Sequence, residues 1–192
     1  MPDALTLDPR RTALVLIDLQ AGILARTTAP HTSAEVLERC VALAERLRAA
    51  RGHVVLVRVS FSASGADALS QPVDEAMPAS ARPEGWDELS PALGNDERDI
   101  RITKRQWGAF YGTELDLQLR RRGVDTIVLG GISTNFGVES TARDAWERAY
   151  AVVFAEDAMA SMQADSHAFA VRTIFPRLGR VRSTEEVLEA LK

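Results

Sequence analysis

Short apolar segments alternate with amphipathic segments along almost the whole chain of 192 residues. Residues 13–17 are apolar without a break, as in a strand that a sheet buries on both faces. The expected strands are residues 13–17, 54–59, 100–103, 126–129, 151–155 and 180–182. The expected helices are residues 33–50, 113–122, 135–149, 165–175 and a last one opened by a capping box of Ser183 and Glu186. This alternation predicts one α/β domain with a parallel sheet covered by helices on both faces.

The composition excludes several classes of protein. Lys and Arg number 23 and Asp and Glu 27, so the net charge is −4, which argues against non-specific binding of nucleic acid. The longest strongly apolar run, residues 13–17, is far shorter than the roughly 20 residues of a membrane-spanning helix, and the N-terminus lacks a signal-peptide pattern. The single cysteine, Cys40, cannot form an internal disulfide, which fits a reducing cytoplasm. We therefore expect a cytoplasmic protein that binds neither nucleic acid nor membranes.

Residues 60–99 interrupt the alternation. They are rich in proline and glycine and show little periodicity. A loop of this length in a compact domain is typically a binding lid, a subunit contact or a disordered segment. The sequence leaves these three alternatives open.

Polar residues end two of the expected strands, where ligands bind in parallel sheets. Asp18 directly follows the first apolar run, and partial burial there would raise its pKa toward values useful in acid–base catalysis. The alternative is an aspartate that caps the following turn. Lys104 ends the third strand and, taken alone, would be a surface lysine. Together they indicate a site, because an ammonium near the carboxylate would hold it ionised or stabilise an oxyanion.

A third segment, residues 130–145, runs from a strand through two glycines into a helix. Free amides at such a helix start can bind an anion or a developing oxyanion. The dinucleotide-binding fingerprint is absent. Ser133 and Thr134 are candidate nucleophiles, but an N-cap role is favoured.

These three segments, in this order, resemble the isochorismatase-like superfamily, also called cysteine hydrolases. The motifs are Leu-Ile-Asp18-Leu-Gln20, Ile-Thr-Lys104-Arg-Gln-Trp-Gly-Ala-Phe110 and Gly-Ile-Ser-Thr-Asn-Phe-Gly137-Val-Glu-Ser-Thr-Ala-Arg-Asp-Ala. The resemblance covers residues 12–191. It implies a Rossmann-like three-layer sandwich with a six-stranded, mostly parallel sheet, and a single hydrolase domain over residues 1–192. It also implies a site of aspartate, lysine and usually cysteine, and a non-proline cis peptide near Ile132–Ser133.

The chain departs from the common pattern of that superfamily at two places. Gly137 stands where the amidases have their nucleophilic cysteine, and Cys40 lies on the apolar stripe of the first long helix, as a small core residue would. The Asp-x-His element that follows the second strand in nicotinamidases is missing, and the three histidines are widely separated: His31, His53 and His167. We therefore expect no cysteine nucleophile, no metal and no other cofactor.

True isochorismatases resemble this chain because they too have glycine at the cysteine position. On that reading Asp18 is the general acid that protonates an enolpyruvyl ether, Lys104 holds it, and Gly137 shapes the pocket. Weaker substrate-binding candidates share a place near the strand ends or in the third motif: Gln20, Arg58, Trp107, Phe110, Ser133 and Asn135. Arg58 lies in a buried run and either binds a substrate carboxylate or pairs with a structural acid.

Two functions follow from this reading. The first is a hydrolase of a small molecule, and the second is a catalytically silent ligand-binding or assembly protein on the same scaffold. The resemblance and Trp86 in the irregular segment also predict a homo-oligomer, at least a dimer.

Overall fold

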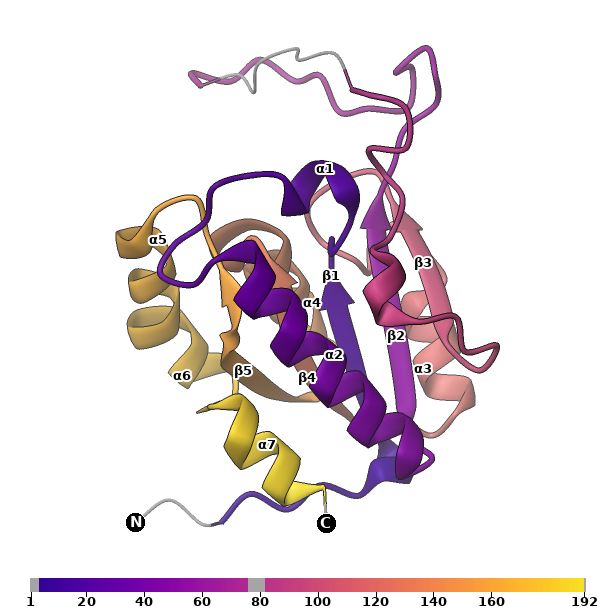
Figure 1. Cartoon of the computed structure of the whole chain (residues 1–192), viewed down its shortest axis with the longest axis vertical. Helices are drawn as coiled ribbons and strands as arrows, with labels where there is room; N and C mark the ends of the chain where they lie inside the picture. Colours follow the sequence, from indigo (N-terminus) through magenta and orange to yellow (C-terminus); the bar gives the residue numbers. More distant parts are fainter. Residues whose placement is uncertain (1–3, 76–81, 192) are drawn as a thin grey trace.

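The computed structural model describes residues 4–75 and 82–191, and it contains one sheet of six parallel strands in the order β3-β2-β1-β4-β5-β6. Helices cover both faces of the sheet (Figure 1). The strands are β1 Thr12–Ile17, β2 His53–Val59, β3 Ile100–Lys104, β4 Thr126–Ile132, β5 Ala151–Ala160 and β6 Arg180–Arg182. The α-helices are α1 Ala21–Leu24, α2 Ser33–Ala49, α3 Leu115–Arg121, α4 Glu139–Glu147, α5 Ala164–Phe169, α6 Phe175–Leu178 and α7 Thr184–Ala190. The predicted fold class is confirmed.

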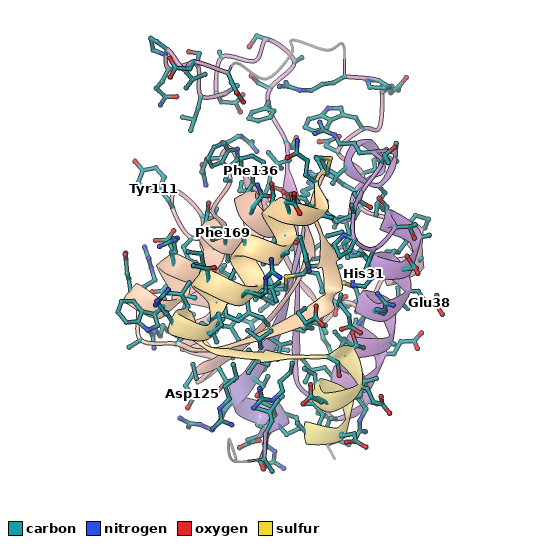
Figure 2. The ribbon with its side chains drawn as sticks, turned by 90° about the vertical axis from the view of Figure 1, so that its left-hand side faces the viewer. His31, Glu38, Tyr111, Asp125, Phe136 and Phe169 are labelled. Carbon is teal, nitrogen blue, oxygen red and sulfur yellow. The ribbon has the colours of Figure 1, made fainter. Side chains whose placement is uncertain are left out.

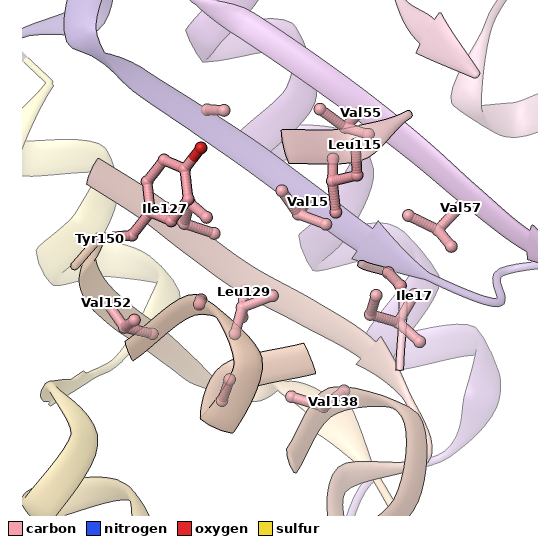
Figure 3. Close-up of a cluster of buried hydrophobic side chains, with 14 of the residues drawn as sticks. Val15, Ile17, Val55, Val57, Leu115, Ile127, Leu129, Val138, Tyr150 and Val152 are labelled. Atoms are coloured by element: carbon pink, nitrogen blue, oxygen red, sulfur yellow. The ribbon is translucent and has the colours of Figure 1, made fainter. Parts of the chain in front are cut away.

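Strand β1 shows why the molecule has three layers. Val15 and Ile17 pack into a cluster that includes side chains of α3, α4 and α6 (Figure 3), whereas Leu14 and Leu16 pack against α2 and α7 on the other face. Every residue of the strand is buried. Because full burial of one such side chain contributes about 1.5–3 kcal/mol, these two clusters hold the sheet between its helices.

Several element boundaries differ from the predicted ones. Strand β4 runs on through its glycines to Ile132, and β5 continues to Ala160. The register of the two strands shifts between Leu129 and Gly131, and pairing resumes at Gly131, within the glycines that the sequence suggests as a strand end. The π-helical turn η3 (Thr134–Val138) precedes α4, and η4 (Ala170–Ile174) separates α5 from α6, so two predicted helices are each divided.

The irregular segment after β2 rises beyond the carboxyl ends of the strands (Figure 1). Its only named element is the 3₁₀ turn η2 (Pro91–Leu93) within the described residues, and residues 76–81 lie outside them. Phe61 and Trp86 stack with ring centroids 6.1 Å apart, and the Arg82 guanidinium lies over both rings. This contact leaves Trp86 half-buried rather than freely exposed. The helices in the described ranges are all too short or too polar to cross a bilayer.

A candidate active site at the carboxyl end of the sheet

Asp18 and Lys104 meet at the carboxyl end of the sheet. Lys104, the last residue of β3, donates from Nζ to Asp18 Oδ2 at 2.7 Å and to the Gln106 carbonyl oxygen at 3.1 Å. Strand alternation alone would point residue 18 toward the side of Leu16. Asp18 instead has a left-handed backbone, with φ 54°, and its carboxylate lies on the side of Ile17, which Lys104 also faces. The left-handed backbone of Asp18 thus brings its carboxylate to the Lys104 ammonium.

The environment of Asp18 makes its carboxyl a weaker acid than it is in water. Its side chain is 8% exposed, and Oδ1 has no hydrogen-bond partner among the described residues. Burial raises the pKa of Asp18 to about 6, although the charge of Lys104, its hydrogen bond and the Val59 backbone amide act in the opposite direction. A carboxyl with this pKa can give and take a proton near neutral pH, as a general acid or base must.

The backbone of Gly137 lies close to the Asp18 carboxylate. It lies in η3, which follows the non-proline cis peptide Ile132–Ser133 that the family resemblance implies. A Cβ built on Gly137 would lie 2.8 Å from Ile17 Cγ2 and 3.4 Å from Asp18 Oδ2. Any side chain here would therefore press on Ile17, and glycine allows the turn to approach the acid this closely.

An exposed aromatic pair lies beside Gly137. Trp107 is 57% exposed and Phe136 is 40% exposed, and their ring centroids are 4.8 Å apart. The Trp107 carbonyl oxygen would be 3.5 Å from a Cβ on Gly137. Figure 2 shows Phe136 and the exposed Tyr111 toward the same end of the molecule. Phe110, by contrast, is buried in the core cluster near Tyr150, so of the two candidate wall residues only Trp107 is at the surface.

Ser133 and Asn135 join a small polar network. The Ser133 hydroxyl donates to Asn135 Oδ1 at 3.0 Å and to Ser161 Oγ at 3.1 Å, and Ser161 also donates to Asn135. Ser133 occupies the N-cap position of η3, but its side chain makes no capping bond. Ser133 is thus at the favoured N-cap position without capping through its side chain, which bonds Asn135 and Ser161 instead, and the Thr134 hydroxyl lies against a histidine.

Gln20 and Arg58 are engaged elsewhere. Gln20 is fully buried, and its amide group donates to the Val59 carbonyl and accepts from the Val59 amide, which extends the β1–β2 contact. Arg58 and Lys104 point to opposite faces of the sheet, since Arg58 shares a face with Leu56. The Arg58 guanidinium lies 3.7 Å from Asp87, so the geometry matches the structural-acid alternative.

Cys40 is buried on the far side of the sheet from Gly137. Its thiol donates to the Ala158 carbonyl at 3.4 Å, and burial raises its pKa well above the usual range. Thiolate chemistry at this position is therefore disfavoured. Within the described part of the chain, no three His, Cys, Asp or Glu residues gather where they could hold a metal ion.

Two residues of the site region carried no individual sequence signal. The Thr141 hydroxyl donates to the Gly137 carbonyl at 2.7 Å and accepts from the Ala109 amide at 3.1 Å, so it joins α4 to the loop after Lys104. His167, in α5, is buried and lies 2.9 Å from the Thr134 hydroxyl. Thr141 lies inside the third motif, whereas nothing local in the sequence marks His167.

Comparison with known proteins gives consistent matches over nearly the whole chain. The isochorismatase domain model matches residues 12–186. The isochorismatase family protein YecD of Escherichia coli O157:H7 is 56% identical over 97% of this chain and 100% of its own length. A solved isochorismatase family protein from Burkholderia thailandensis has a TM-score of 0.94 at 43% identity, covering 98% of this chain and 99% of that one. The ureidoacrylate amidohydrolase RutB of Cronobacter turicensis is 31% identical over 82% of this chain and 78% of its own length.

Proposed function

The chain belongs to the isochorismatase family of hydrolases, and we propose that it hydrolyses a small molecule with Asp18 as general acid and without a cysteine nucleophile. The observation that carries this proposal is the buried, unpartnered Oδ1 of Asp18, an acid whose pKa is raised to about 6. An unsatisfied buried oxygen costs about 1–3 kcal/mol, and a substrate would supply its missing partner. Gly137, beside it, offers no side chain that could attack.

The reaction that fits these groups is cleavage of an enolpyruvyl ether. Asp18 donates its proton to the methylene carbon of the vinyl ether, which turns the ether carbon into an oxocarbenium ion. Water adds to that carbon and returns a proton to Asp18, and collapse of the resulting hemiketal releases pyruvate and an alcohol. No covalent enzyme intermediate forms, so the reaction requires an acid in the right protonation state and room for the ether.

Lys104 and Gly137 have supporting roles in this scheme. Lys104 holds Asp18 Oδ2 through a buried contact and stabilises the carboxylate that remains after proton transfer. Gly137 lets the backbone of the turn lie close to Asp18 and places no thiol beside it. Trp107 and Phe136 form an apolar wall on which a planar substrate can rest.

One observation favours the second function, a silent ligand-binding protein. Lys104 is bound to Asp18 and Gln106, and Arg58 is paired with Asp87 on the other face of the sheet. Neither candidate cation is therefore free to hold a substrate carboxylate. A protein that binds a neutral molecule at the aromatic pair without converting it would have the same arrangement.

A turnover assay separates the two functions. Wild type, Asp18→Asn and the control Asp165→Asn, which alters an exposed carboxylate, are incubated with isochorismate and pyruvate release is measured. A parallel panel of amides, including ureidoacrylate, is followed by ammonia release. We expect turnover by wild type and the control, and a loss of about 10²- to 10⁴-fold in Asp18→Asn, because the amide cannot donate a comparable proton. Equal turnover in Asp18→Asn would refute the proposed mechanism, and binding without turnover of any compound would favour the silent protein.

A further inference from the structure

Thr134 is the first residue of the turn η3, which contains Gly137, and its side chain ties this turn to the helix α5. It is fully buried, and its Oγ1 lies 2.9 Å from Nδ1 of His167, which is also buried. The two residues come from different elements, η3 and α5. The Thr134 hydroxyl is already engaged by His167, so its hydrogen bond serves to place the turn rather than to attack a substrate.

The other side of the imidazole faces a carboxylate. Nε2 of His167 lies 3.8 Å from Glu156 Oε2, and the ring of His31 stands edge-on to it with centroids 6.1 Å apart. A carboxylate on this side favours the tautomer with its proton on Nε2, which leaves Nδ1 to accept from Thr134. The imidazole thus has a hydrogen-bond partner on one side and a carboxylate 3.8 Å away on the other.

Both ends of the turn are held by side-chain hydrogen bonds. Thr134 is tied to α5 through His167, and the Gly137 carbonyl is tied to α4 through Thr141. The stretch between these anchors contains the backbone that meets Asp18. A change at the Thr134 anchor therefore alters how closely Gly137 covers the carboxylate.

We propose that His167 is a positioning residue of the active site, which holds Thr134 and thereby fixes the turn that presents Gly137 to Asp18. This inference rests on the proposed function, in which Asp18 is the acid. It adds a residue on α5 whose contacts are with Thr134, Glu156 and His31. Its effect on the reaction passes through the burial of Asp18.

The test uses the folded, ligand-free protein and follows the Asp18 carboxyl carbon by ¹³C NMR during a pH titration. Thr134→Val removes the hydroxyl at almost constant shape, and Thr134→Ser retains it. His167→Leu removes the acceptor, and His167→Asn keeps one at the place of Nδ1. Phe169→Leu, at an exposed position of the same helix (Figure 2), is the matched control. Thermal unfolding of every variant is recorded alongside.

We expect Thr134→Val and His167→Leu to lower the Asp18 pKa by about 0.5–1 unit, because a loosened turn admits water to the carboxyl. Thr134→Ser, His167→Asn and Phe169→Leu should titrate like wild type. An unchanged Asp18 pKa in Thr134→Val would overturn the proposal, whatever happens to its melting temperature, and so would an equal shift in Thr134→Ser. If His167→Leu does not fold, Thr134→Val decides. The titration needs no substrate, so an inactive wild type would refute the proposed function and leave this result standing.

Discussion

Replacing Lys104 with methionine should raise the pKa of Asp18 and move the pH dependence of the reaction with it. Nζ and Oδ2 are 2.7 Å apart, and the lysine side chain is only 2% exposed. An opposite charge at such a distance lowers a carboxyl pKa by about 1–3 units. Without it, the Asp18 pKa of about 6 should rise to about 7–9. Methionine matches the length of the lysine stem and removes the donor to Asp18 Oδ2 and to the Gln106 carbonyl oxygen.

The protonated fraction of Asp18 changes accordingly. At pH 7 a carboxyl with a pKa of about 6 is protonated in roughly one molecule in ten, whereas one with a pKa of about 8 is protonated in roughly nine in ten. If Lys104 only tuned Asp18, the variant would be the better general acid at pH 7. We expect lower turnover instead, because the carboxyl also loses the group that orients it, while the pH at which activity falls away moves upward.

The stability of the fold should show the same shift. The folded pKa of Asp18 lies above the unfolded value of 3.8, so ionisation opposes folding, and this carboxyl's contribution to stability falls as pH rises from about 4 to about 6. The loss in wild type is of the order of 3 kcal/mol, since one pKa unit corresponds to about 1.4 kcal/mol. In Lys104→Met the decline should continue to about pH 7–9.

Three measurements check this reasoning. The ¹³C titration of Asp18 gives its pKa, urea unfolding at pH 5 and pH 8 gives the stability difference, and the pH–rate profile gives the functional consequence. Arg105→Met is the matched control, because Arg105 is the next residue, is only half-buried and pairs with Asp67. An Asp18 pKa in Lys104→Met at or below the wild-type value would refute the electrostatic argument.

Three further outcomes follow from the same geometry. Gly137→Cys should lower the free energy of unfolding by about 1–3 kcal/mol, because its Cβ would overlap Ile17, and it should not create efficient amide hydrolysis; a variant as stable as wild type in urea would contradict this. Iodoacetamide should leave turnover unchanged, because Cys40 is buried. EDTA should also leave turnover unchanged, and the circular dichroism should stay constant with both reagents. Loss of turnover after either reagent would show a thiol or metal requirement. Sedimentation at micromolar concentration should show at least a dimer, through the exposed apolar side chains of the irregular segment such as Leu69 and Val73; a monomer alone would contradict it.

The parts of the fold that the sequence predicts are those set by burial over several residues. All six predicted strands are present, and the clearest of them is the apolar run 13–17, because it has no polar side to leave in water. The ends of β4 and β5 were missed, because they depend on the register shift at Leu129 and Gly131, which is a property of two strands together. The π-helical turns likewise have no period of their own in the sequence.

The sequence predicts some features of the candidate site and not others. The structure brings Asp18, Lys104 and Gly137 together, as expected for residues at the carboxyl ends of parallel strands. Arg58 is on the other face, and strand alternation already indicates this, since Arg58 is two residues from Leu56 and both face α2. The contact of Thr134 with His167 could not be foreseen, because it joins two elements that only the tertiary fold brings into contact.

The strongest reason to regard the site as active is that its geometry lowers the stability of the folded chain. A left-handed backbone at a non-glycine residue costs of order 1 kcal/mol, and Asp18 adopts one in order to face Lys104. Burial of its carboxyl and the unpartnered Oδ1 add further unfavourable free energy. A scaffold that only packed or only bound an apolar ligand would be more stable with an apolar pair at these two positions, since buried ion pairs are often weaker than such replacements. Strain and desolvation are concentrated on one acid, next to a glycine whose Cβ would overlap Ile17, and this is the environment that the proposed proton transfer to a bound substrate would use.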